Sequence, residues 1–220
     1  MNIYLKEPSG DWKLYDIDRA DHPELKKRNI EVKCEWSSIG AWSSIGEGSR
    51  IGEWSRIGEG SRIGEGSRIG EWSRIGEGSR IDARSSIGAR SSIGEGSRIG
   101  EWSSIGEGSS IGARSRIGEL SRIGAGSRIG EGSRIGARSS IGKDDIVVIR
   151  PVGSRYDSLT IYRSNGVLWA GTGCYIGKLD DFVERVKQTH GKNEHARRYM
   201  AAVKFAREAL RGGENKGGPF

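Results

Sequence analysis

Isoleucine recurs at every sixth position through a long central segment of the chain. The series runs unbroken from Ile39 to Ile141, and a serine stands two positions before each isoleucine. Alternate residues of a β-strand point to the same face, so each serine shares a face with its isoleucine and the residue between them points away. A glycine follows every isoleucine except Ile81 and allows a corner in the backbone. Each group of six residues therefore predicts one short strand and one bend.

Eighteen such groups fill residues 35–142. Three groups close a triangular coil, and stacked coils pair their strands in parallel, which satisfies the backbone polar groups. The pattern predicts a mainly β fold, a parallel β-helix of about six coils that is roughly 29 Å tall at ~4.8 Å per layer. A disordered tract rich in glycine, serine and arginine is the alternative, but disorder would not need isoleucines in strict register.

The pattern I-G-x-x-S-x resembles the hexapeptide signature of left-handed β-helix proteins over about half of the chain. The left hand of the expected helix comes from this resemblance, because parallel crossovers are otherwise right-handed. The resemblance also implies a homo-oligomer, with a trimer favoured, and proteins of this kind are commonly acyltransferases that use coenzyme A or related donors. Acyl transfer is therefore one alternative function.

Those enzymes generally use a histidine as a base, near a loop extruded from the coils. Residues 35–142 contain no histidine and no insertion in any group of six. On this ground the chain is expected not to be an enzyme. The sequence predicts no catalytic residue, no cofactor and no metal site.

Stacking the coils places residues 18 positions apart in one column. One corner column begins with Trp36, Trp54 and Trp72 and continues with Arg90. Tryptophans one layer apart would form an exposed aromatic ladder, and such apolar surface is usually covered. The three tryptophans are therefore predicted to contact another subunit, although they could also simply cover the corners of the coils.

A second column, at the outward strand position, begins with Ser44 and continues with five arginines from Arg62 to Arg134. Nucleic-acid binding through this basic stripe is a further alternative function. Residues 35–142 contain 15 arginines and 13 acidic residues, a net charge of only +2. Compensated charges of this kind usually keep a sheet surface soluble, so a nucleic-acid partner is not expected.

The two ends of the chain break the repeat. Residues 1–34 predict an N-terminal cap with short strands at NIYLK and WKLYDID and a turn or helix start at HPELKKR. Residues 143–211 predict an α+β module: a hairpin at 158–170, a helix closed by Gly191, and a final helix that begins after Asn193. Residues 212–220 predict a flexible tail.

The stretch from Gly173 to Tyr199, with GCYIG and THGKNEHA, resembles a C-terminal module of uncharacterised phage and prophage proteins. The resemblance implies a phage setting. The main hypothesis is a non-enzymatic binding or scaffold protein that engages a host protein or sequesters a small anionic ligand. Its specificity is placed in the C-terminal module, where the net charge over 143–220 is +5. The candidate binding residues are Arg155, Arg163, Lys187, His190, Asn193, His195, Arg197 and Tyr199.

The histidines of this module also fit two alternatives to ligand binding. His190 and Asn193 have the spacing of the end of one helix and the cap of the next, which needs no chemistry. Cys174 and the histidines could form a nucleophile pair, but two histidines alone lack the four ligands that zinc usually takes. Cys34 and Cys174 have no metal-ligand spacing and are expected to be free thiols.

The first residues carry charges where a signal peptide needs an apolar stretch, and no run approaches the ~18 apolar residues of a membrane span. The chain is therefore expected to be cytoplasmic, in the host cytoplasm if it is phage-encoded, with no membrane partner. Its net charge of +7 favours anionic partners only weakly, because 36 basic residues face 29 acidic ones.

Overall fold

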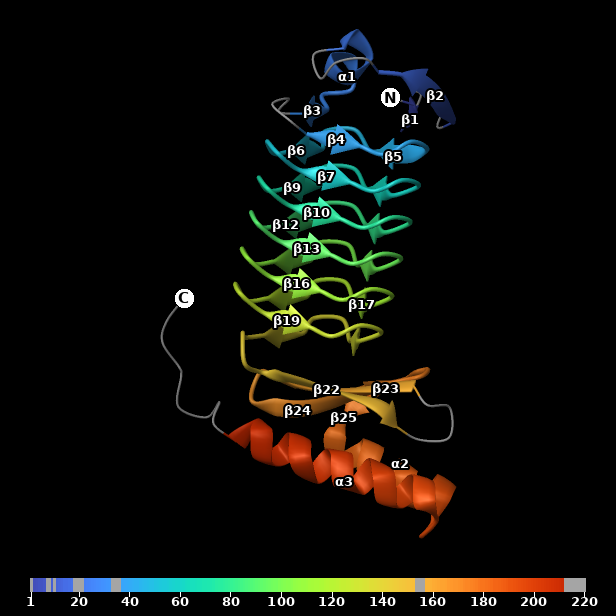
Figure 1. Ribbon diagram of the computed structural model, residues 1–220, viewed down its shortest axis with the longest axis vertical. Helices are drawn as coiled ribbons and strands as arrows, with labels where there is room; N and C mark the ends of the chain where they lie inside the picture. The colour runs from blue at the N-terminus through green and yellow to red at the C-terminus, as the bar shows by residue number, and fades with distance from the viewer. Residues whose placement is uncertain are drawn as a thin grey trace.

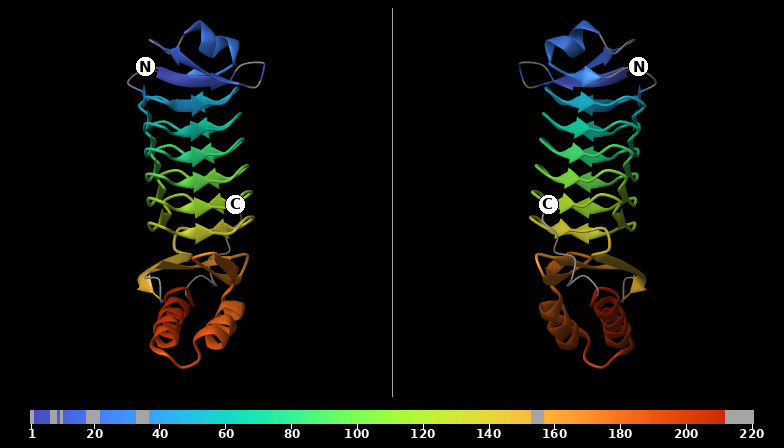
Figure 2. Two further views of the ribbon diagram at one scale, coloured as in Figure 1. Left: turned by 90° about the vertical axis from the view of Figure 1, so that its right-hand side faces the viewer. Right: turned by 90° about the vertical axis from the view of Figure 1, so that its left-hand side faces the viewer.

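The computed structural model describes residues 2–6, 9, 11–17, 22–32, 37–152 and 157–211. A stack of coils lies between an N-terminal cap and a C-terminal layer of strands and helices (Figure 1). Two views turned by 90° show the coils in even layers with the two long helices at one end (Figure 2). The predicted flexible tail, 212–220, lies outside the described residues.

Three parallel sheets form the walls of the coil stack, and neighbouring strands in a sheet are mostly 18 residues apart. The first coil sheet has the order β2 (Trp12–Asp16), β1 (Asn2–Lys6), β5 (Ser43–Ile45), β8 (Arg62–Ile63), β11 (Arg80–Ile81), β14 (Arg98–Ile99), β17 (Arg116–Ile117) and β20 (Arg134–Ile135). The second contains β4 (Ser38–Ile39), β7 (Arg56–Ile57), β10 (Arg74–Ile75), β13 (Ser92–Ile93), β16 (Ser110–Ile111) and β19 (Arg128–Ile129). The third contains β3 (Glu31–Val32), β6 (Arg50–Ile51), β9 (Arg68–Ile69), β12 (Ser86–Ile87), β15 (Ser104–Ile105), β18 (Arg122–Ile123) and β21 (Ser140–Ile141). The mainly β solenoid of about six turns is confirmed, and its left hand stays a prediction.

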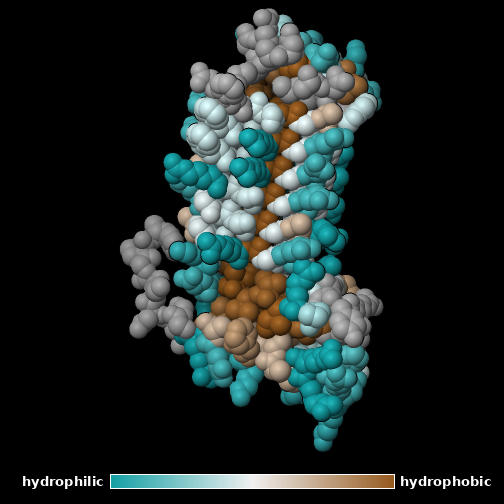
Figure 3. Space-filling model, viewed as in Figure 1, coloured by the Kyte–Doolittle hydropathy of each residue, from teal (hydrophilic) through white to brown (hydrophobic). Residues whose placement is uncertain are grey.

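The core of the stack consists of the repeated isoleucines. Each isoleucine from Ile39 to Ile141 is at most 6% exposed. On the face of the molecule seen in Figure 3, a brown hydrophobic seam runs along the stack, bordered by pale and teal residues. At its lower end the seam meets a broader apolar area where β22 (Ile146–Val152) lies, and the first four residues of that strand are half-buried. The six-residue period therefore places one apolar side chain on each wall of every coil.

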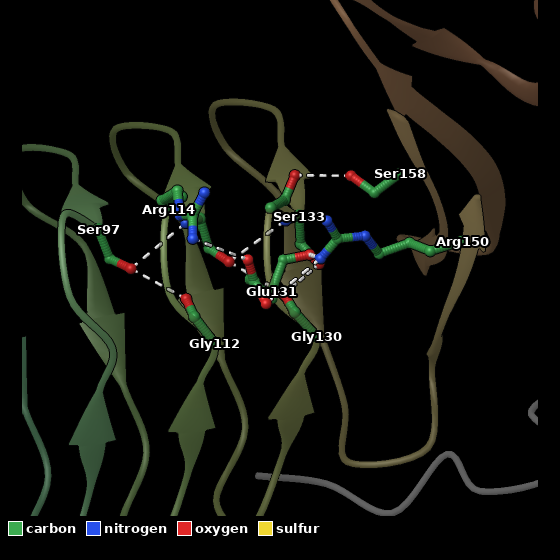
Figure 4. Close-up of polar contacts among 10 residues, drawn as sticks. Ser97, Gly112, Arg114, Gly130, Glu131, Ser133, Arg150 and Ser158 are labelled. Carbon is green, nitrogen blue, oxygen red and sulfur yellow. Dashed lines mark hydrogen bonds and ion pairs between the residues drawn. The ribbon is translucent and has the colours of Figure 1, made fainter. Parts of the chain in front are cut away.

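The repeated serines are buried beside the isoleucines, and their hydroxyl groups are satisfied. Ser97 Oγ donates to the carbonyl oxygen of Gly112 at 2.9 Å and accepts from the amide of Ser115 at 3.3 Å (Figure 4). The same serine-to-glycine bond, fifteen residues apart, recurs along the stack. A buried hydroxyl is tolerated when it is hydrogen-bonded, so serine fills the narrow space beside isoleucine without a penalty.

The N-terminal end covers the first coil. Strand β1 pairs antiparallel with β2 and parallel with β5, and Leu5, Ile17 and Leu25 are buried in the same cluster as the isoleucines. The short helix α1 (Pro23–Lys27) begins after His22, whose Nδ1 accepts from the amide of Glu24 at 3.2 Å. The two strands and the helix start that the sequence predicts are present.

The C-terminal end is a four-stranded antiparallel sheet covered by two helices. Its order is β22 (Ile146–Val152), β23 (Asp157–Ser164), β24 (Val167–Thr172) and β25 (Tyr175–Lys178), followed by α2 (Leu179–His190) and α3 (Glu194–Ala209). The predicted hairpin and both helices are confirmed. The sequence does not predict strand β25, because it is only four residues long, is interrupted by Gly177 and pairs only through the edge that β24 offers.

Strand β23 lies across the last coil and bonds to it through side-chain oxygens. The amide of Arg134 donates to Thr160 Oγ1 at 3.3 Å, and the amide of Ser140 donates to Ser164 Oγ at 2.8 Å. Ser158 Oγ donates to the carbonyl of Gly132 at 2.8 Å. These hydroxyl groups take the place of a further coil.

An acidic side chain joins the last coils to the sheet. Glu131 lies 3.5 Å from the guanidinium of Arg114, one coil earlier, and 3.5 Å from that of Arg150 in β22 (Figure 4). All three side chains are substantially exposed, so these ion pairs add little stability. Among the described residues no helix is long and apolar enough to cross a membrane.

Candidate functional site

A cleft of about 310 Å³ opens in the C-terminal module, between the β24–β25 turn and the two helices. This volume is at the lower end of the range for small-molecule sites. The residues that line it are Thr172, Gly173, Cys174, Tyr175, Phe182, Arg185, Val186, Thr189, His190 and Tyr199. We call it the module cleft.

Aromatic rings form one part of the module cleft. Phe182 is buried, and its ring centre lies 5.4 Å from that of Tyr175 and 5.4 Å from that of Tyr199. The second pair is nearly perpendicular, at 83°, an arrangement that aromatic quadrupoles favour. Phe182 and Val186 lie one turn apart on α2, so the apolar face of this helix is also the wall of the cleft.

His190 brings an imidazole to the module cleft. It is the last residue of α2 and is half-buried. Its ring centre lies 5.7 Å from that of His195 and 5.9 Å from that of Tyr199. The Nδ1 atom of His195 is buried and has no hydrogen-bond partner among the described residues. Both predicted histidines and the predicted tyrosine therefore lie together.

Asn193 has a structural role. Its side-chain oxygen accepts from the amide of Ala196 at 3.0 Å and caps α3, while the amide of Gly191 donates to the carbonyl of Lys187 at the end of α2. The spacing of His190 and Asn193 thus follows from the end of one helix and the start of the next. The turn between α2 and α3 also places His190 beside the module cleft.

Arg185 and Tyr175 form the polar side of the module cleft. The guanidinium carbon of Arg185 lies 5.6 Å from the centre of the Tyr175 ring. Burial raises the pKa of the Tyr175 phenol, the charge of Asp181 raises it further, and Arg185 opposes both effects. The phenol stays protonated at neutral pH and donates to the carbonyl of Lys178 at 3.2 Å. Cys174 is an exposed free thiol on the adjoining turn.

Within the described part of one chain, the predicted cationic residues do not lie together, and their meeting around a ligand at a junction between subunits stays a prediction. Arg163 donates from Nη2 to the carbonyl of Leu210 at 2.5 Å, eleven residues beyond Tyr199 and so about 16 Å further along α3. Lys187 pairs with Glu184 at 2.7 Å, and Arg197 is exposed outside the module cleft. Arg155 lies outside the described residues.

Of the residues that line the module cleft, only His190 and Tyr199 were among the candidate binding residues, and Arg185, Tyr175 and Phe182 were not. Phe182, Arg185 and Thr189 stand at positions i, i+3 and i+7 of one helix, so they share a face. That spacing is visible in the sequence. No local pattern in the sequence indicates β25, the strand that places Tyr175 beside this face of α2.

The tryptophan column exists on the coil surface. Trp54 and Trp72 are stacked, with ring centres 4.8 Å apart and planes inclined by 2°. They are 37% and 54% exposed. Trp36 lies outside the described residues, and Arg90 pairs with Glu107 at 3.2 Å. Two of the three predicted contact residues are thus seen to form a ladder, and its covering by another subunit stays a prediction.

The arginine column exists as well. In the first coil sheet Arg80 lies in register with Arg62 on one side and Arg98 on the other, and the series continues to Arg134. Corner residues next to these strands include Glu65, Asp82 and Glu101. Acidic side chains therefore flank the stripe, which reduces its attraction for a polyanion.

Comparison with known families gives a match within the coils. Residues 43–77 and 73–107 match the family model of the bacterial transferase hexapeptide, six repeats. The repeat of this family is the six-residue unit that forms the coils described above. This is a hexapeptide-repeat β-helix protein. No curated protein sequence matches the chain.

Solved structures that are similar to this hexapeptide-repeat protein include acyltransferases. A mutant GDP-perosamine N-acetyltransferase from Caulobacter crescentus, with CoA and GDP-perosamine, is 24% identical over 49% of this chain and 53% of its own, at a TM-score of 0.44. A mutant of AntD, an N-acyltransferase from Bacillus cereus with dTDP and coenzyme A, is 18% identical over 58% and 87%, at 0.46. The acetyltransferase domain of PglB from Neisseria gonorrhoeae is 19% identical over 51% and 54%, at 0.38. The chain thus spans about half the length of the first of these proteins.

These comparisons correct the main functional hypothesis. The non-enzymatic, phage-type binding or scaffold protein is wrong, because the matched family model is that of bacterial transferases. A lack of histidine and of an inserted loop within the coils does not exclude an enzyme, because a general base can also stand on another part of a chain. Acyl transfer, the first alternative, is a transferase reaction and agrees better with this family match.

Proposed function

We propose that this protein is an acyltransferase and that His190 is its base. The matched family model describes bacterial transferases, and the hexapeptide proteins that the repeat resembles commonly transfer acyl groups. The observation that carries the proposal is the module cleft, where an imidazole stands beside a cavity large enough for a small acceptor.

The chain has three histidines, and their surroundings select one. His22 uses Nδ1 to cap α1. His195 has a buried Nδ1 and does not line the module cleft. His190 lines it, and its ring has no hydrogen-bond partner among the described residues that would occupy it. A general base must reach the proton that it removes, so His190 is the candidate.

The reaction needs one proton to move twice. The acceptor's hydroxyl or amine gives its proton to the His190 imidazole as its oxygen or nitrogen attacks the carbonyl carbon of an acyl thioester. A new C–O or C–N bond forms, the C–S bond breaks, and the imidazolium returns the proton to the departing thiolate. The products are the acylated acceptor and the free thiol, so atoms and charge balance. General-base catalysis of this kind contributes about 10²- to 10⁴-fold to the rate.

The acyl donor is a substrate of this reaction. The module cleft is small, so we assign it to the acceptor and to the thioester carbon, and not to the whole of a large donor. Phe182, Tyr175 and Tyr199 keep water from one side of the cleft, which limits hydrolysis of the thioester.

A finer proposal concerns assembly. We propose that the protein forms a homo-oligomer, with a trimer favoured by its resemblance to hexapeptide-repeat proteins. The exposed stack of Trp54 and Trp72 supports a contact at that corner of the coils.

The proposed function is tested by measuring free coenzyme A released from acetyl-, propionyl- and longer acyl-CoA in the presence of amino sugars, amino acids and phenols. Chromatographic detection is preferable to a thiol reagent, because Cys174 is exposed and would react. We expect acceptor-dependent release, lowered about 10²- to 10⁴-fold by His190→Ala. The matched control is His22→Ala, which removes an imidazole far from the cleft. Equal release by the wild type and His190→Ala, or no release with any pair, would refute the proposal.

A further inference from the structure

The charge of the module cleft indicates the kind of acceptor that it takes. None of its lining residues in the described part of the chain is acidic, although the chain has 29 acidic residues. The lining includes one arginine, one histidine and three aromatic rings. A pocket of this composition attracts an anionic group and gives apolar surface to the rest of the molecule.

Arg185 differs from its neighbours on the helices. Lys187 pairs with Glu184 at 2.7 Å, Arg198 with Glu194 at 2.5 Å, and Arg207 with Asp180 at 2.6 Å. Arg185, in contrast, has no carboxylate oxygen within 4.0 Å among the described residues.

An ordinary partner for Arg185 is available and is not used. Asp181 stands one turn earlier on α2, at the i−4 position that usually forms an ion pair on a helix. The Arg185 side chain is instead placed against the Tyr175 ring, 5.6 Å from its centre. A guanidinium group held against an aromatic face keeps its N–H groups free at its edge, in the geometry that matches a carboxylate or phosphate.

We infer that the acceptor bears a carboxylate or phosphate group bound by Arg185, with an aromatic or hydrocarbon body packed against Phe182 and Tyr199. The inference rests on the proposed function, because it describes the molecule whose proton His190 removes. His190 and Arg185 are five positions apart on α2 and line the same cleft, so the anionic group and the nucleophile belong to different parts of one small molecule.

The test is direct binding without any acyl donor. Benzoate and phenyl phosphate carry the two anionic groups on one aromatic body, and benzamide is a neutral probe of nearly the same shape as benzoate. Binding is followed by ligand-observed NMR and by titration calorimetry. We expect at least one of the anions to bind about tenfold more tightly than benzamide, since a hydrogen-bonded charge contributes about that difference. The tighter of the two anions identifies the group.

Variants separate this site from general attraction to a basic protein. In Arg185→Gln the anion should lose about tenfold in affinity and bind no better than benzamide. Arg197→Gln removes one positive charge from α3 outside the cleft and should leave the preference unchanged. Asp181→Asn removes the carboxylate that could pair with Arg185, and it should not weaken anion binding. Each variant is first shown to melt like the wild type.

The outcomes distinguish the two proposals. Equal binding of benzoate, phenyl phosphate and benzamide, or an unchanged preference in Arg185→Gln, overturns the inference even if acyl transfer is observed. A preference that Arg185→Gln abolishes supports the anionic site whether or not thiol release is found.

Discussion

The hydroxyl group of Tyr162 lies 3.0 Å from the amide nitrogen of Gly136 and accepts its hydrogen bond. One coil earlier, the amide of Gly118 donates to the carbonyl of Ile135 at 2.9 Å. Tyr162 therefore supplies the oxygen that a further coil would have supplied, and it is fully buried in the isoleucine cluster. The last coil of a solenoid has backbone groups that no further coil can pair. Here the hydroxyl group of Tyr162 pairs one of them.

Removing this oxygen should destabilise the protein. Tyr162→Phe keeps the ring but leaves the Gly136 amide without a partner, so we expect a loss of about 1–3 kcal/mol in the free energy of unfolding. Chemical denaturation measures it. Tyr175→Phe is the control, because its hydroxyl bonds at the surface, and it should cost under about 0.5 kcal/mol. A Tyr162→Phe variant as stable as wild type would show that the capping bond is unimportant.

The second prediction concerns the core of the coils. Ile87 is 1% exposed in the third coil sheet, so Ile87→Asp places a carboxylate among isoleucines that offer no partner. We expect loss of more than about 4 kcal/mol and of cooperative unfolding. The control is Ser104→Asp on the outward face of the neighbouring strand β15, which should melt like the wild type. A native-like melt for Ile87→Asp would contradict the burial of this series.

Oligomerisation is tested through the tryptophan stack. Light scattering should give about three times the 24.0 kDa mass of one chain. Trp54→Ser should weaken the assembly and shift its dissociation to higher protein concentration, because exposed stacked indoles are typical contact residues. Leu120→Ser, an exposed apolar residue at another corner, is the control. A monomer in the wild type rules out the trimer, and a trimer insensitive to Trp54→Ser places the contact elsewhere.

Acid should loosen the N-terminal cap. The hydrogen bond from Arg28 lowers the pKa of Glu24 below its usual 4.5. A lowered carboxyl pKa means that the ion pair stabilises the fold fully above the ordinary pKa and that this contribution is lost as the pH falls through the lowered value. The melting temperatures of wild type and Glu24→Gln should therefore differ at pH 7 and converge as the pH falls below the lowered pKa. A constant difference across this range would contradict the assignment.

Much of the fold could be predicted from the sequence, because the six-residue period reflects the geometry of the coil. A serine and an isoleucine every six residues determine which side chains enter the core. The same register between neighbouring strands then pairs the backbone groups on each wall of the coil. Strand β25 escaped prediction because its pairing depends on the edge of β24, a contact that no local pattern records.

The candidate site was only partly predictable. His190, His195 and Tyr199 could be grouped from the sequence because they are close together in it, at the end of one helix and near the start of the next. Arg163 and Lys187 were grouped with them by charge alone, and the structure gives each a different partner. Arg185 was overlooked because its role depends on the ring of Tyr175, which comes from a separate strand.

The role of His190 as the base is tested most directly by chemical rescue. His190→Gly removes the imidazole and leaves space beside the open cleft, so the variant should transfer acyl groups at about 10²- to 10⁴-fold lower rate than wild type. Added imidazole should restore a measurable part of this rate, and substituted imidazoles should restore it in order of their basicity. A His190→Gly variant that keeps the wild-type rate, or one that no imidazole restores at any concentration, would contradict the account.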